Sequence, residues 1–137
     1  MQGRCFGSVF HYAFTNCQAN VLYFALTIIK ISKEDITMVK MLDKDNYEQE
    51  VMKAEGTVLV DFYADWCGPC RMQGPIVEQL SEERTDVKFC KLNVDEAVAI
   101  AMELGITSIP TIMVVKNGQI TFKEAGLMQK AQLEALL

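Results

Sequence analysis

The sequence of 137 residues is short of the residue types that many metal and nucleic-acid sites require. It contains one histidine, so it has no histidine pair for a zinc site of the cysteine–histidine kind. Lysine and arginine number 13 against 18 aspartates and glutamates, and the formal net charge is −5. Because nucleic-acid binding depends on clustered basic side chains that neutralise phosphates, we expect no nucleic-acid partner.

The chain also has little that indicates a membrane. The apolar run VLYFALTII covers nine residues, 21–29, whereas a spanning helix needs about 20. Only Arg4 is basic ahead of this run and no small-residue cleavage site follows it, so the flanks of a signal peptide are missing. We expect residues 1–37 to be a disordered or dispensable extension, residues 38–137 to form the domain, and the protein to be cytoplasmic without membrane association. An exported or membrane-tethered protein stays open as an alternative, in which residues 21–29 act as a signal.

The cysteine count argues against a fully paired secreted framework. The five cysteines are an odd number, and they lie at positions 5, 17, 67, 70 and 90. Unpaired thiols fit a reducing compartment better than an oxidising one. We expect Cys90, in an apolar strand pattern, to be a buried core thiol, and we assign no role to Cys5, Cys17 or His11.

Strand and helix patterns alternate from residue 36 onward. Strands are predicted over 36–41, 57–64, 87–94, 108–115 and 119–123, and helices over 43–56, 72–80, 95–104 and 129–137. Such alternation predicts a parallel sheet covered by helices, and the Asn117-Gly118 turn adds an antiparallel hairpin at its edge. We therefore expect an α/β fold with a central mixed sheet of about five strands and helices on both faces.

The stretch Cys67-Gly68-Pro69-Cys70 allows three interpretations. A zinc site needs four ligands, and the remaining cysteines and the histidine stand at no recognisable spacing. A purely structural disulfide would close so small a loop that it would restrict the unfolded chain little. Cys67 follows a predicted buried strand and opens the next helix, where free backbone N–H groups favour a thiolate. A redox pair is the interpretation that this position favours.

Several motifs together resemble the thioredoxin family. TVLVDFYADWCGPCRM (57–72), KLNVDE (91–96), GITSIPTIMVVKNG (105–118) and the region of Gly126 occur in the order found in that family. The resemblance covers about residues 37–137. It implies the thioredoxin fold, and it implies a protein-disulfide reductase and electron carrier with a redox-active Cys67–Cys70 disulfide and no bound cofactor or metal.

The resemblance also implies roles for the residues of the centre. Cys67 attacks the disulfide of a substrate, and Cys70 resolves the mixed disulfide, for which we expect Cys70 to be the more enclosed of the two. Asp61 lies in an apolar run, where a carboxylate is costly unless it is paired or protonated. Burial would raise its pKa, so that it can take the proton of Cys70, and the resemblance makes Lys91 its neighbour.

A docking surface beside the two cysteines is implied in the same way. The resemblance implies a cis Ile109–Pro110 bond that faces the two sulfurs. The expected docking residues are Trp66, Gly68, Pro69, Ile109, Pro110, Ala125, Gly126 and Leu127. Pro69 stands between the cysteines where a histidine cation would stabilise the thiolate, and its presence favours a reductase over an oxidase.

The partners that the resemblance implies are proteins. They are an NADPH-dependent thioredoxin reductase and disulfide-containing substrates such as ribonucleotide reductase, peroxiredoxins and methionine sulfoxide reductases. We expect a monomer. A second alternative, a binding subunit in which the reduced fold serves a partner without turnover, also stays open.

Overall fold

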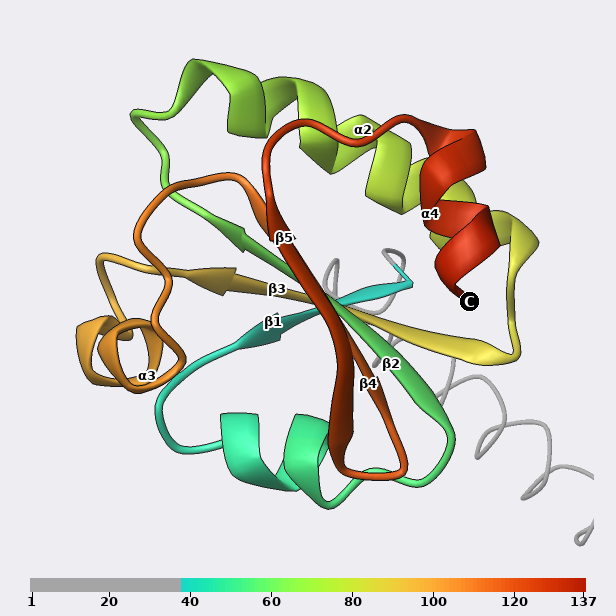
Figure 1. The fold of residues 1–137 in the computed structure, drawn as a ribbon, viewed down its shortest axis with the longest axis horizontal. Coiled ribbons are helices and arrows are strands. Elements are labelled where there is room, and N and C mark those ends of the chain that lie inside the picture. Colours follow the sequence, from blue (N-terminus) through green and yellow to red (C-terminus); the bar gives the residue numbers. More distant parts are fainter. Residues whose placement is uncertain (1–37) are drawn as a thin grey trace, which may run out of the picture. The chain divides into compact units, whose positions relative to one another are not determined.

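A five-stranded mixed sheet forms the centre of the fold (Figure 1). The computed structural model describes residues 38–137, and the expectations for residues 1–37 lie outside this part. The strands are β1 (Val39–Leu42), β2 (Thr57–Tyr63), β3 (Val87–Asn93), β4 (Thr111–Lys116) and β5 (Gln119–Ala125), and the helices are η1 (Glu48–Met52), α2 (Gly68–Glu83), α3 (Val98–Glu103) and α4 (Lys130–Leu136). The α/β class and the mixed sheet expected from the sequence are confirmed.

The strands lie in the order β1-β3-β2-β4-β5. The first three are parallel, β4 is antiparallel to β2, and β5 is antiparallel to β4. The sequence had placed the antiparallel part at the hairpin alone, but it already begins with β4. Helix α3 has six residues and is about 9 Å long, too short to return along a seven-residue strand such as β3. The chain therefore enters β4 at Thr111, beside Phe62 near the end of β2.

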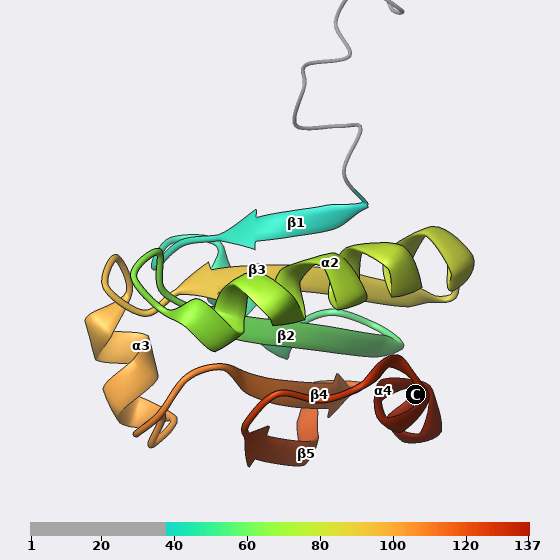
Figure 2. The ribbon, with the colours of Figure 1, turned by 90° about the horizontal axis from the view of Figure 1, so that it is seen from above.

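Two apolar cores lie on opposite faces of the sheet. Helices α2 and α4 cover one face, and η1 and α3 cover the other (Figures 1 and 2). Strand β2 contributes to both, because successive side chains of a strand point to opposite faces: Leu59 joins the core under α2, whereas Val58 and Val60 join the other. Asp61 is the one charged side chain in this buried strand.

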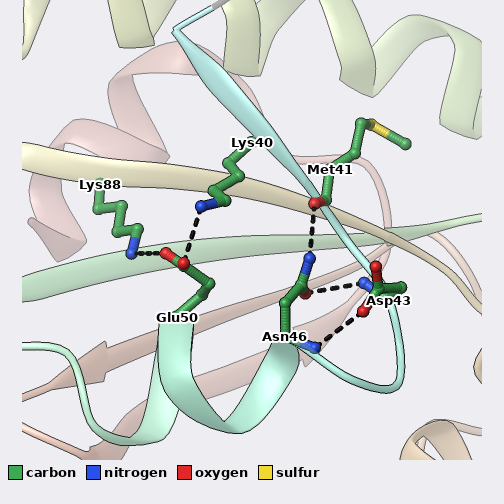
Figure 3. A network of polar contacts seen from close by, with 6 residues as sticks. All are labelled: Lys40, Met41, Asp43, Asn46, Glu50 and Lys88. Carbon is green, nitrogen blue, oxygen red and sulfur yellow. Dashed lines mark hydrogen bonds and ion pairs between the residues drawn. The ribbon is translucent and has the colours of Figure 1, made fainter. Parts of the chain in front are cut away.

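The segment after β1 differs from the helix predicted over 43–56. The Asp43 carboxylate accepts hydrogen bonds from the backbone N–H groups of Asp45 and Asn46, both at 2.8 Å, as a cap would. The turns that follow form the π-helix η1 instead of an α-helix. The Glu50 carboxylate accepts hydrogen bonds from Lys40 of β1 and Lys88 of β3 (Figure 3). This ion-paired network attaches η1 to two neighbouring strands.

Candidate active site

The two cysteines lie where β2 passes into α2. Cys67 is the N-cap residue of α2, and Cys70 stands in the first turn of that helix. The structure contains the Cys67–Cys70 disulfide. The backbone N–H of Cys70 donates a hydrogen bond to the Cys67 sulfur at 3.3 Å. An N–H group and a helix N-terminus at this sulfur favour its anionic form, which is the nucleophile in disulfide exchange.

Burial does not distinguish the two cysteines. Cys67 is 4% exposed and Cys70 is 5% exposed in the disulfide form, so the expectation that Cys70 is the more enclosed residue is wrong here. Both belong to a small apolar cluster with Ala64, against which Val94 and Ile109 pack. What separates the cysteines is their position on the helix: Cys67 accepts the N–H bond, whereas Cys70 donates it.

Asp61 and Lys91 lie side by side on neighbouring strands. They are register partners in the parallel β2–β3 pairing. Asp61 is fully buried, and among residues 38–137 neither carboxylate oxygen has a hydrogen-bond partner. Burial raises the pKa of the Asp61 carboxyl to about 7, the charge of Lys91 opposes this rise, and that of Glu78 adds to it. A carboxyl that titrates near neutral pH can both take and release a proton.

The ammonium of Lys91 is bound elsewhere. Its Nζ lies 2.7 Å from an oxygen of Glu78 on α2. Both residues line an open hollow of about 300 Å³, whose wall also includes Cys70 and Gly74. The same hollow is therefore lined by Cys70 and by the ion pair. Nothing in the local sequence pattern around Glu78 had indicated this contact.

A second hollow lies on the other side of the centre, beside Trp66. Its volume is about 370 Å³, and its lining residues are Trp66, Val94, Ile106, Thr107, Ser108 and Ile109. Trp66 is 69% exposed, and its indole N–H donates a hydrogen bond to Asp95 at 2.9 Å. Val94, Asp95 and Ile106 lie in the motifs KLNVDE and GITSIPTIMVVKNG, but they were not predicted as site residues.

The loop after β5 lies next to the Ile109–Pro110 bond. This bond is cis, as the resemblance had implied. The backbone N–H of Gly126 donates a hydrogen bond of 2.8 Å to the carbonyl of Pro110. Gly126 has a φ of +122°, a conformation that side-chain-bearing residues rarely adopt. Ala125 and Gly126 are exposed, and Leu127 is half-buried.

The same loop is held from the side of α2. The amide of Gln73, a fully buried residue, accepts a hydrogen bond from the backbone N–H of Met128 at 2.8 Å and donates one to its carbonyl at 3.3 Å. Gln73 follows Cys70 by three residues on the helix. No local pattern predicts this contact, because it joins positions 55 residues apart.

Among residues 38–137, no three His, Cys, Asp or Glu side chains cluster as metal ligands. Within the same residues, no helix is long and apolar enough to cross a bilayer. Cys90 is a buried free thiol, as expected.

Comparison with known proteins agrees with the geometry of the cysteine pair. Residues 38–137 match the model of the family described as thioredoxin. The chain is 44% identical over 97 residues to a thioredoxin of Rickettsia bellii, covering 70% of this chain and 92% of that protein. It is 41% identical over 93 residues to a thioredoxin of Pseudomonas aeruginosa, covering 67% and 86%. It is 42% identical over 100 residues to a thioredoxin of Porphyra purpurea, covering 72% and 94%.

Proposed function

The chain belongs to the thioredoxin family and is a protein-disulfide reductase, and we propose that Cys67 begins each turnover as the nucleophile. The observation that supports this role is the hydrogen bond that the Cys70 backbone N–H donates to the Cys67 sulfur at the start of α2. The Cys67 thiolate attacks one sulfur of the substrate disulfide. A mixed disulfide forms, and the other substrate sulfur leaves as a thiolate that takes a proton.

Cys70 then completes the transfer. Its thiol gives a proton to the Asp61 carboxylate, and the resulting thiolate attacks the Cys67 sulfur. The Cys67–Cys70 disulfide forms, the second substrate sulfur leaves, and Asp61 returns the proton to water or to the leaving thiolate. Two electrons have passed from the dithiol to the substrate. Asp61 suits this role because it is buried, lies under α2, and has a pKa of about 7. Lys91 acts on that pKa as a nearby positive charge.

The substrate is proposed to lie across an apolar surface around the sulfurs. Trp66, Gly68 and Pro69 form one side of this docking surface, with Ile109 and Pro110 beside them. Ala125, Gly126 and Leu127 complete it. Pro110 itself is buried, but the backbone of the exposed residues Ala125 and Gly126 can pair with an extended substrate segment. A small surface of this kind suits many protein partners.

The oxidised pair is returned to the dithiol by a partner enzyme. Disulfide-containing substrates and a thioredoxin reductase are the partners of this family in general, and we propose an NADPH-dependent reductase here. Ribonucleotide reductase, peroxiredoxins and methionine sulfoxide reductases are candidate substrates. We place the protein in the cytoplasm as a monomer that needs no bound cofactor, with residues 1–37 dispensable for the chemistry.

Insulin reduction driven by dithiothreitol tests the proposal with the full chain. The parent protein is expected to accelerate precipitation of the freed insulin chains, and Cys67→Ser is expected to abolish the acceleration. Cys70→Ser is expected to collect substrates as mixed disulfides on Cys67, visible on a non-reducing gel. Mixed disulfides on Cys70 in a Cys67→Ser variant, with none in Cys70→Ser, would reverse the assigned roles. Comparing the full chain with residues 38–137 tests whether the extension matters.

A further inference from the structure

Glu78 forms an ion pair with Lys91, a residue that the fold also places next to Asp61. Lys91 and Asp61 are register partners, and both face α2, on the same side of the sheet as Leu59 and Phe89. The Lys91 ammonium nevertheless pairs with Glu78, at 2.7 Å. The side chain of Lys91 is only 17% exposed, and that of Glu78 is 48% exposed. The lysine is thus turned toward the helix and the rim of the hollow beside Cys70.

Gly74 leaves room for this arrangement. A Cβ at position 74 would lie 3.2 Å from the Lys91 Nζ, closer than an unstrained contact. Any larger residue at this turn of α2 would press on the ammonium. The absence of a side chain at Gly74 leaves space for the Lys91 ammonium, and the Glu78 carboxylate, one turn later, binds it.

Asp61 is left without a direct partner by the same arrangement. Among the described residues, both of its buried oxygens lack a hydrogen bond, although a lysine occupies the neighbouring strand position. The charges that act on it come from Lys91 on β3 and Glu78 on α2. Strand β4 places the apolar Ile112 opposite it. On β2 itself, Tyr63 is the next titratable residue on the same face.

We propose that Glu78 is a positioning residue that holds the Lys91 ammonium away from Asp61 and thereby sets the pH range in which Asp61 gains and loses its proton. The inference rests on the proposed function only for the use made of that proton. Glu78 touches neither sulfur in this scheme, and it acts through Lys91. Without the Glu78 charge, Lys91 is free to approach the buried carboxylate, and an ammonium close to a carboxylate stabilises its ionised form.

The direct test is an NMR titration of Asp61 in the oxidised full chain, with 13C-labelled aspartate. In Glu78→Gln, the midpoint of Asp61 is expected to fall by about one pH unit. The matched control is Glu82→Gln, which removes a charge from an exposed site one turn further along α2. It is expected to leave the midpoint in place. An unchanged midpoint in Glu78→Gln, or an equal shift in both variants, overturns the inference.

A double variant separates positioning from simple loss of a nearby charge. In a Lys91→Met background, Glu78→Gln has no ammonium to release, and its effect on the Asp61 midpoint is expected to fall to less than half. An undiminished effect would mean that Glu78 acts on Asp61 without Lys91, which also overturns the inference.

A kinetic measurement keeps this inference distinct from the proposed function. Cys67 is joined to thionitrobenzoate, and Cys70 releases the coloured thiolate in a single turnover, which absorbance follows at each pH. The pH profile of this release is expected to move with the Asp61 midpoint in Glu78→Gln and to stay in place in Glu82→Gln. A shifted Asp61 midpoint with an unshifted release profile would uphold the position of Lys91 and contradict the role of Asp61 as the proton acceptor of Cys70.

Discussion

Trp66 and Asp95 are joined by a hydrogen bond from the indole Nε1 to a carboxylate oxygen, 2.9 Å long, across 29 positions of sequence. Asp95 is itself fixed, because its backbone N–H donates to the side chain of Asn93 at 3.0 Å. The exposed indole is therefore oriented by the end of β3 and does not rest on its own loop alone. A group that is held before the partner arrives loses less conformational freedom on binding.

Asp95→Ala is expected to weaken docking without changing the chemistry. The indole of Trp66 would lose its anchor, and KM for a protein disulfide should rise about two- to fivefold, because one hydrogen bond contributes about 1 kcal/mol. The value of kcat and the rate of Cys67 alkylation should stay as in the parent. Glu96→Ala, at the neighbouring exposed position, is the control. An equal rise in KM for both variants would point to lost surface charge instead.

Asp61 makes stability depend on pH. Its pKa is raised from 3.8 to about 7 by burial, so its protonated form suits the fold. Its contribution to the free energy of unfolding is therefore fully present below about pH 4, the unfolded pKa, and is lost as the pH rises through 7. Asp61→Asn stays neutral and should be more stable than the parent at pH 8, by roughly 4 kcal/mol, with little difference at pH 4. Urea unfolding at both pH values measures this, and an equal difference at the two would contradict it.

Cys90 is expected to resist modification in the folded protein. It is fully buried, and burial raises the pKa of its thiol to about 12. Little thiolate is therefore available at pH 8, and a reagent cannot reach the sulfur. After reduction and treatment with iodoacetamide, peptide mapping should find Cys67 alkylated and Cys90 unmodified. Rapid labelling of Cys90 without denaturant would show that β3 opens locally.

Two glycines with positive φ should differ in their tolerance of alanine. Gly118 has a φ of +77°, and a Cβ there would lie 2.5 Å from the carbonyl oxygen of Met52. Gly56 has a φ of +85° but has open space around it. Gly56→Ala should cost about 1 kcal/mol from backbone strain alone, and Gly118→Ala should cost at least about 2 kcal/mol, because η1 must move. Chemical unfolding of both variants decides the order, and similar losses would contradict it.

Local patterns in the sequence predicted much of this fold. Strand β2 was visible as a continuous apolar run, and Asn117-Gly118 marked the hairpin turn, where both residues have positive φ. The direction of β4 was missed beforehand because it depends on how far the short α3 connection reaches. A periodic pattern predicts whether a segment is a helix or a strand. It does not predict from which end of the sheet the chain enters the next strand, which decides whether that strand is parallel or antiparallel.

The centre was predictable at the cysteines and less so around them. Cys67 and Cys70 were found from their spacing and from their place after a strand. The contacts of Trp66, Gln73 and Glu78 were not found, because each joins segments that meet only in the folded chain. The prediction that Cys70 is more enclosed than Cys67 was wrong, because both cysteines belong to the same buried apolar cluster.

The loop that carries Gly126 is tied at two points, to Pro110 on one side and to Gln73 through Met128 on the other. Two attachments within three residues leave this edge of the surface little freedom to reshape itself. On the proposed docking surface, the partner is then expected to adapt: a segment that can leave its own fold and straighten should bind better than a disulfide held inside a stiff domain. Selection among partners would thus depend on their local unfolding as much as on their sequence.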